Sequence, residues 1–203
     1  MNQKAEKNPV NKRKLQANAT REKIYKTAFD LITNLGFDNV SVDQICEESG
    51  VAKGSFYHHF RSKDDIVIET YKNVDRDYTE EIMNLPGDIG CVERIIVTVK
   101  FQARYAKMKG VSFVKQIYKS QLDTGTQFFI SEERPFFKLI KETIETGQDN
   151  GELRADIASD VMTRLVLSIS RGITYDWCLR DGSYDIEEIM EHFFRTLLPA
   201  FHS

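Results

Sequence analysis

The sequence predicts an all-α protein of about nine helices, and three observations support this fold class. Apolar residues recur three and four positions apart along successive segments of the 203-residue chain, which is the spacing of one helix face. Glycine and proline are scarce, with 11 and 4 residues, and they lie mainly between these segments, where helices end. No stretch shows the strict alternation of apolar and polar residues that is typical of a half-buried strand.

The first two predicted helices have recognisable start and stop residues. Thr20 is the expected N-cap of the first helix, and Gly36 is expected to end it. Ser41 and Gln44 have the spacing of a capping box, in which the hydroxyl accepts from a free backbone N–H and the amide reaches back to the cap. Gly50 is expected to end the second helix, because glycine adopts the left-handed C-cap conformation at little cost.

Seven more helices are predicted downstream. A third covers residues 52–60, and a fourth starts at Ser62 and stops before Pro86. Pro135 suits a first helical turn, and Asp185 is the expected cap of the last helix. The remaining five helices are predicted over residues 91–109, 112–122, 135–148, 160–180 and 186–201.

Charge is distributed unevenly along the chain. The formal net charge is −3, but residues 1–26 hold eight Lys or Arg and two Glu, so the front end is positive and the remainder is negative. This distribution indicates that only the front end meets a polyanion such as nucleic acid. A solvated, disordered tail would have the same composition.

Composition argues against several classes of protein. Cys46, Cys91 and Cys178 are odd in number, far apart and without a C-x-x-C spacing, so we expect buried free thiols, with no disulfide scaffold and no zinc site. The first residues lack the apolar core of a signal peptide, and no run approaches the ~18 apolar residues of a membrane span. We therefore expect a cytoplasmic protein that has no membrane partner.

The third predicted helix has two different faces. At 100° per residue, Ala52, Phe56 and Phe60 share one face, which we expect to be buried. The opposite face and its flanks are polar and consist of Lys53, Gly54, Ser55, Tyr57 and His58. Because glycine permits close approach and the other side chains can reach phosphates and base edges, this face could enter a groove of DNA.

The adjacent histidines, His58 and His59, raise the alternative of a metal or catalytic site. Neighbouring residues lie about 100° apart on a helix, so they cannot chelate one ion as an i, i+4 pair can. No third ligand, nucleophile or orienting acid lies near them in the sequence. His59 is expected to lean toward the core, and a surface without function remains the other alternative for this face.

Residues 20–66 resemble the N-terminal DNA-binding domain of the TetR family of bacterial repressors. The resemblance rests on two ordered motifs, "NLGFDNVSVDQI" over 34–45 and "GVAKGSFYHHFRSKDDI" over 50–66. It implies an all-helical homodimer with a helix-turn-helix and a divergent C-terminal domain that holds a small-molecule inducer. The family often has Thr where Ser55 stands and Tyr where His59 stands, which leaves the base preference open.

The resemblance also implies which residues contact DNA, mostly through phosphates. The matching positions are Ser41, Lys53, Gly54, Ser55, Tyr57, His58 and Lys63. Independently, the free N–H groups at the start of the fourth helix would favour a phosphate beside Lys63, although Asp64 and Asp65 are also ordinary capping acids there.

Three parts of the chain are expected. Residues 1–18 would form a basic, flexible arm whose Lys12, Arg13 and Lys14 lie along phosphates or in a minor groove. Residues 19–66 would form the DNA-binding domain, and residues 67–203 the ligand-binding and dimerisation domain.

The last two predicted helices are the expected dimer interface. Their apolar stripe is wide, and Ser168 and Gly172 are small residues one turn apart that would let helix axes come close. The interface residues expected from this pattern are Leu165, Ser168, Gly172, Ile189, Phe193, Phe194 and Leu197. A stripe that faces the core of a monomer would also explain the pattern.

The aromatic residues of the middle helices predict a ligand cavity. A mostly apolar cavity with one or two polar groups suits a drug-sized molecule, and Arg104 would be a buried cation in search of an anion. The residues expected to line it are Phe101, Arg104, Tyr105, Met108, Phe113, Tyr118, Phe137 and Trp177. Each aromatic residue could instead fill the core.

The function that follows is a sequence-specific transcriptional regulator. We expect a homodimeric repressor that binds a palindromic operator in double-stranded DNA and is released by a small-molecule inducer of unknown identity. The alternative is an architectural, chromosome-organising protein of the same fold without an inducer. We expect no enzyme activity, cofactor or metal, because no poised nucleophile or ligand cluster is present in the sequence.

Overall fold

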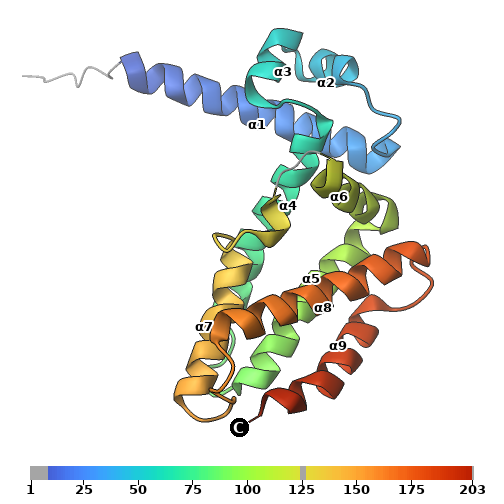
Figure 1. Ribbon diagram of the computed structural model, residues 1–203. Coiled ribbons are helices and arrows are strands. Elements are labelled where there is room, and N and C mark those ends of the chain that lie inside the picture. The colour runs from blue at the N-terminus through green and yellow to red at the C-terminus, as the bar shows by residue number, and fades with distance from the viewer. Residues whose placement is uncertain (1–8, 124–126, 203) are drawn as a thin grey trace, which may run out of the picture. The chain divides into compact units, whose positions relative to one another are not determined.

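The computed structural model is all-α, as predicted, and describes residues 9–123 and 127–202 (Figure 1). Within these ranges the chain forms nine α-helices and two short 3₁₀ helices, with no strand beyond an isolated bridge between Leu153 and His202. The α-helices are α1 (Pro9–Leu35), α2 (Val42–Ser49), α3 (Lys53–His59), α4 (Lys63–Met83), α5 (Cys91–Lys109), α6 (Val111–Asp123), α7 (Pro135–Asp149), α8 (Ser159–Leu179) and α9 (Ile186–Leu197). The 3₁₀ helices are η1 (Gln127–Ile130) and η2 (Leu198–Phe201).

Two compact units divide the chain, with the boundary between Val67 and Ile68. The first unit contains α1, α2, α3 and the first turn of α4, and the second contains the rest of α4 and all later helices. α4 is therefore the one element of the described chain that belongs to both units. None of the described helices is long and apolar enough to cross a membrane.

The start of α1 differs from the prediction. The helix begins at Pro9, not at Thr20, so residues 9–18 continue α1 and do not form a separate arm. The Thr20 hydroxyl donates to the Gln16 carbonyl at 3.0 Å within the helix, so it does not act as an N-cap. The stretch before Thr20 has few apolar residues but many good helix formers. Because the buried part of α1 already forms a helix, these residues can continue it toward the N-terminus without a new nucleation step.

The core of the first unit is built where three helices meet. Ile24, Ala28 and Ile32 lie four residues apart on α1 and are buried. They pack with Ile45 of α2 and Phe56 of α3, which are both fully buried. The other buried members of this core are Val40, Cys46, Phe60 and Ile66.

Three predicted signals of the first unit are confirmed, namely the caps at Ser41, Gly50 and Gly36. The Ser41 hydroxyl caps α2 by accepting from the Gln44 N–H at 3.0 Å. Gly50 ends α2 at φ +62°, a left-handed conformation that a residue with a Cβ adopts only at a cost. Gly36 ends α1 at φ +85° in the same way. These caps hold α2 and α3 at the separation expected of a helix-turn-helix.

The second unit is a helical bundle around α5 and α8. α5 packs against α9 and α7, and α8 packs against α7, α6 and α9. The buried side chains include Ile96 and Val99 of α5, Ile140 of α7 and Val166 of α8. As predicted, Pro135 occupies the first turn of α7, and Asp185 caps α9 by accepting from the N–H groups of Glu187 and Glu188.

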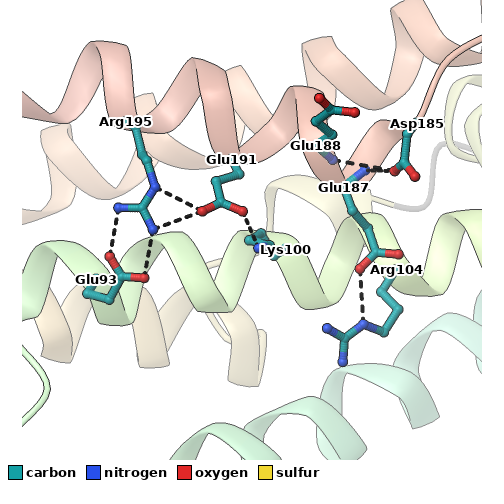
Figure 2. A network of polar contacts seen from close by, with 8 residues as sticks. All are labelled: Glu93, Lys100, Arg104, Asp185, Glu187, Glu188, Glu191 and Arg195. Atoms are coloured by element: carbon teal, nitrogen blue, oxygen red, sulfur yellow. Dashed lines mark hydrogen bonds and ion pairs between the residues drawn. The ribbon is translucent and has the colours of Figure 1, made fainter.

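An ion-pair network joins α5 to α9 (Figure 2). Arg195 donates to both carboxylate oxygens of Glu93 at 2.9 Å and also pairs with Glu191, which in turn pairs with Lys100. One turn away, Arg104 pairs with Glu187 at 3.1 Å. Ion pairs between side chains of opposite charge therefore join α5 and α9 along their exposed side.

Candidate functional site

The outward face of α3 is open to solvent. His58 is exposed and half of the Tyr57 side chain is exposed. No neighbouring part of the described chain comes within 4 Å of the position that a Cβ on Gly54 would take. This face therefore has an imidazole, a phenol and an uncovered stretch of backbone, which are the groups needed to approach phosphates and base edges closely.

The inward face of α3 is formed by aromatic residues only. Phe56 and Phe60 are buried, with exposed fractions of 0% and 2%. Ala52, which was expected beside them, is exposed because it precedes the helix as an extended N-cap residue at φ −69°, ψ 147°. Ser55 is partly buried on the flank of the helix.

Lys53 is the first residue of α3 and is exposed, and Ser41 is exposed at the start of α2, where its hydroxyl is the N-cap acceptor. The Lys53 ammonium pairs with Asp43 at 2.6 Å, and both side chains are more than half exposed. Hydrogen bonding to Asp43 raises the pKa of Lys53 above its ordinary value. Exposed pairs of this kind contribute little to stability because water screens them, so a phosphate can replace Asp43 at little cost.

Lys63 is engaged differently from the prediction. Its ammonium donates to the carbonyl oxygens of Phe37 and Val40 at 2.6 and 2.5 Å, and it lies 4.2 Å from the centre of the Phe37 ring. Burial lowers the pKa of Lys63. This side chain ties the segment after α1 to the start of α4.

The two histidines have different environments, as predicted. His59 is partly buried, and burial, followed by the neighbouring His58 and Arg21, lowers its pKa. The two rings lie 4.9 Å apart in an edge-on arrangement. Among the described residues no group of three His, Cys, Asp or Glu could hold a metal ion.

The basic residues near the N-terminus belong to α1. Arg13 and Lys14 are exposed on this helix, so any contact with DNA would be made by a helix and not by an extended arm. The side chain of Lys12 lies outside the described residues.

In the second unit, an apolar groove of about 490 Å³ opens between α6, η1 and α8. Large apolar side chains in it face solvent, since Leu122 is 82% exposed and Ile130 is 63% exposed. The residues that line the groove are Tyr118, Gln121, Leu122, Phe129, Ile130, Arg171 and Tyr175. Its size and its apolar walls with a few polar groups are typical of small-molecule sites.

A small inner cavity lies behind the groove. Tyr118 and Phe129 line both spaces, so their rings, 5.4 Å apart, stand between them. The inner cavity measures about 10 Å³, which is the space of one water molecule. Gln102 lines it, donates to the Tyr71 hydroxyl at 3.3 Å, and has no partner for its amide oxygen among the described residues.

Phe129 connects the groove to α4 through its backbone. Its N–H donates to Gln121, and its carbonyl accepts from Arg171 at 2.8 Å and from Arg134 at 3.2 Å. Arg134 in turn binds Asp75 of α4 through two hydrogen bonds of 2.8 and 2.9 Å. A displacement of Phe129 would therefore act on Arg134 and, through it, on the ion pair with Asp75 of α4.

Most residues predicted to line a cavity lie elsewhere. Arg104 is exposed and paired with Glu187, and Met108 is 68% exposed, so neither is buried as expected. Phe101, Phe137 and Trp177 are buried core residues, and Phe113 is partly buried outside the groove. Of the eight predicted residues only Tyr105 and Tyr118 line one of the two spaces.

Six of the seven residues that line the groove were not predicted, namely Gln121, Leu122, Phe129, Ile130, Arg171 and Tyr175. η1 was not predicted, because its four residues follow a "DTGTQ" break and are too short to show a helical period. Tyr175 and Arg171 are four residues apart on α8 and flank its buried stripe, which was the one available signal.

α8 and α9 both have apolar residues that are exposed to solvent. On α8, Leu165 is 46% exposed, and no neighbouring side chain or other segment of the described chain comes within 4 Å of the position that a Cβ on Gly172 would take. On α9, Phe193 is 46% exposed. Phe194, which was predicted to lie at an interface, is only 1% exposed because it faces the core of its own unit. Of the other predicted interface residues, Ser168 is exposed, Leu197 is 39% exposed and Ile189 is partly buried, and the stripe on α8 also includes the exposed Val161 and Leu179.

A second hollow of about 550 Å³ lies near the start of α5 and is polar. Its anion position is already filled, since the Glu152 carboxylate accepts from the N–H groups of Cys91 and Val92 at 2.8 and 3.0 Å. Those hydrogen bonds hold the pKa of Glu152 below its ordinary value, against the effect of its burial. This hollow is therefore explained by helix capping.

Two family models match the chain in succession. The model described as "Bacterial regulatory proteins, tetR family" matches residues 24–70, which include α2, α3 and the start of α4. The model described as "YsiA-like protein, C-terminal region" matches residues 76–200. Together they cover both units.

Individual relatives are similar over nearly the whole chain. The HTH-type transcriptional repressor KstR2 of Rhodococcus jostii is 24% identical, over 90% of this chain and 91% of that protein. The FadR repressor of Thermus thermophilus, solved in complex with lauroyl-CoA, has a TM-score of 0.76 at 20% identity, over 88% and 93% of the two chains. FadR from Bacillus subtilis, in complex with stearoyl-CoA, has a TM-score of 0.60 at 15% identity, over 89% and 99%. At such identities the structural likenesses show a shared fold.

Proposed function

The chain belongs to the TetR family of bacterial regulatory proteins, and we propose that it is a homodimeric transcriptional repressor that a small-molecule effector releases from its operator. The observation that carries the proposal is the open polar face of α3 on a helix-turn-helix. Tyr57 and His58 are exposed there beside the uncovered backbone of Gly54.

The residues of this face would share the work of binding DNA. Tyr57, His58 and the backbone at Gly54 would approach base edges and the adjoining phosphates, whereas Ser41, Ser55 and Lys53 would contact phosphates. Arg13 and Lys14 of α1 are exposed and would add to the basic surface. Lys63 would support the fold of this unit, because its ammonium already binds two carbonyls.

Dimerisation would occur through α8 and α9. The exposed stripe with Leu165 and Gly172 on α8, and Phe193 on α9, is an apolar surface that a second copy would cover. A two-fold dimer presents two α3 helices to half-sites about 34–36 Å apart or a multiple of this, so the operator would be palindromic.

The effector would bind in the groove between α6, η1 and α8. The solved relatives in complex with lauroyl-CoA and stearoyl-CoA make fatty acyl thioesters the first class to test here. Binding would displace Phe129, and the change would pass through Arg134 to Asp75 on α4. α4 begins in the DNA-binding unit, so the two functions would be coupled through one helix.

The test is selection of operator DNA with the purified protein, followed by gel shift on the selected site with and without dodecanoyl-CoA. We expect Lys53→Met to weaken binding on all sequences and to reduce the slope of log K against log salt by ~0.9 for each phosphate that the variant no longer neutralises. Lys115→Met removes a similar exposed pair, with Asp181, from the second unit and should leave the slope unchanged. A protein that prefers no site in the selection would refute the repressor function.

The dimer is tested separately by sedimentation. Leu165→Glu puts a charge into the proposed interface and should yield monomers at micromolar concentration, with weaker operator binding. Met83→Glu is the control, because Met83 is 72% exposed on α4, away from α8 and α9 in the sequence. Wild-type protein that sediments as a monomer at this concentration would contradict the proposed dimer.

A further inference from the structure

The guanidinium of Arg171 is bound only by neutral groups of the described chain. It is partly buried in the wall of the groove, where it donates to the Phe129 carbonyl at 2.8 Å and to the Ser168 hydroxyl at 3.2 Å. A guanidinium has five N–H donors and remains charged at any physiological pH. Its positive charge is therefore held in an apolar wall without a counter-charge among the described residues.

The arginines on either side of Arg171 are different. Arg164 of α8 pairs with Glu132 and Asp160, and Arg180, the C-cap residue of α8, pairs with Asp176 at 2.9 Å. Arg171 lies between them in the sequence and forms no ion pair within the described chain. This contrast indicates that the neutral environment of Arg171 is particular to the groove and not a general property of α8.

The neighbouring charge that acts on Arg171 is also positive. Burial lowers the pKa of Arg171 most, and the positive charge of Arg134 lowers it further. Asp75 cannot compensate, since both of its carboxylate oxygens are bound by Arg134. A charge held under these conditions is stabilised strongly by an anion that arrives from outside, because the surroundings screen it less than water does.

The rest of the groove has the opposite character. Leu122, Ile130 and Tyr175 have large apolar surfaces exposed to solvent. Among the described lining residues none is acidic, and Gln121 is the only polar side chain besides Arg171 and the Tyr118 and Tyr175 hydroxyls. A ligand with an alkyl or aryl tail would cover this surface, and a negatively charged head would not be repelled.

We propose that Arg171 is the anion-binding residue of the groove, and that the occupant is an amphiphile whose carboxylate or phosphate oxygens pair with Arg171 while its tail covers Leu122, Ile130 and Tyr175. The inference rests on the proposed role of this groove as the effector site. A neutral molecule of the same size would then be a poor ligand, and Arg171 of α8 would be the residue that discriminates between the neutral and the anionic molecule.

The experiment is calorimetric titration of the full-length protein with a matched series of ligands. Dodecanoate, dodecyl phosphate and dodecanol share one tail and differ in the head, and each is used below the concentration at which it aggregates. We expect both anions to bind wild-type protein at least ~10-fold more tightly than dodecanol. Dodecanoyl-CoA is the fourth ligand, and the comparison of dodecanoate with dodecyl phosphate shows which anionic head the groove prefers.

The variants assign the preference to one residue. Arg171→Met should bring the affinity for the anions down to that for dodecanol and leave the dodecanol affinity nearly unchanged. Arg171→Lys should recover part of the preference, since an ammonium keeps the charge but not the planar geometry. Arg180→Met, at the C-cap of the same helix, should bind all the ligands as wild type does, and thermal melting of each variant shows that it is folded.

Two outcomes would overturn the inference. One is equal binding of dodecanol and dodecanoate by the wild type, and the other is a full anion preference in a folded Arg171→Met variant. Gel shifts on the selected operator separate this result from the proposed function. If anions bind through Arg171 but do not release DNA, the proposal about Arg171 stands and the proposed effector response is wrong. If dodecanol alone releases DNA, the effector response stands and the proposal about Arg171 is wrong.

Discussion

Two arginines of the second unit donate to the same carbonyl but differ in their burial and in whether an acidic residue neutralises them. Arg134, at the start of α7, and Arg171, on α8, both donate to the Phe129 carbonyl. Arg134 is 4% exposed and is neutralised by two hydrogen bonds to Asp75, with the rings of Phe128 and other aromatic residues around it. Arg171 is partly buried at the groove and has no acidic partner among the described residues.

The difference shows how to separate structural charges from functional ones. A charge whose partners are all in its own chain contributes to the fold, and a charge that lacks them is available to a ligand. The first unit repeats this contrast. Lys63 is bound by two carbonyls, whereas Lys53 has a single exposed partner that a phosphate can replace.

The largest expected effect on stability comes from removing Arg134, the arginine that is paired with Asp75. Arg134→Met leaves the buried carboxylate of Asp75 without a partner and should lower the free energy of unfolding by ~3–5 kcal/mol. Urea denaturation followed by circular dichroism measures this loss. The double variant Arg134→Met/Asp75→Leu should recover much of the stability, because no unpaired buried charge remains. A double variant as unstable as the single one would contradict this explanation.

The next effect tests the contrast in the first unit. Lys63→Met removes two charge-assisted hydrogen bonds to the carbonyls of Phe37 and Val40 and should lower the free energy of unfolding by ~1.5–3 kcal/mol. Lys53→Met removes only an exposed pair, so it should leave the free energy of unfolding nearly unchanged but should weaken operator binding. If Lys63→Met kept full stability and abolished DNA binding, the assignment of these two lysines would be reversed.

Arg171→Met should affect stability less than either of these changes. It removes the hydrogen bonds to Phe129 and Ser168, but it also removes an unpaired charge from an apolar wall, so the two effects oppose each other. We expect a change of less than ~1 kcal/mol in the same urea experiment. A loss of stability as large as that of Arg134→Met would place Arg171 among the structural charges.

The smallest effect is a dependence on pH that comes from His59. Its pKa lies below the ordinary 6.5 because burial, His58 and Arg21 disfavour its charged form in the folded state. As pH falls through 6.5 toward that lower pKa, the unfolded chain takes up the proton first, so stability should decrease and then level off. Denaturation midpoints between about pH 7.5 and about pH 5.5 measure this slope, which His59→Gln should reduce.

The sequence alone determined the helices and their ends, because these depend on neighbouring residues. Ser41 and Asp185 cap α2 and α9 as predicted, and Gly36 and Gly50 end α1 and α2 at positive φ. The outward side of α3 also follows from the 100° step of a helix, which separates His58 from Phe56. The start of α1 and the short helix η1 were exceptions, since neither a polar helical extension nor a four-residue helix has an apolar period to reveal it.

Only the tertiary structure decided which side chains line the groove and which charges are neutralised. Phe129 and Arg171 lie 42 positions apart in the chain, and Arg134 and Asp75 lie 59 apart, and no local pattern brings such pairs together. For the same reason Arg104 was expected in a cavity but pairs on the surface with Glu187, 83 positions away. Helical period shows which face of a helix is apolar, but the partner that covers it, and the charge left without one, depend on how the helices pack.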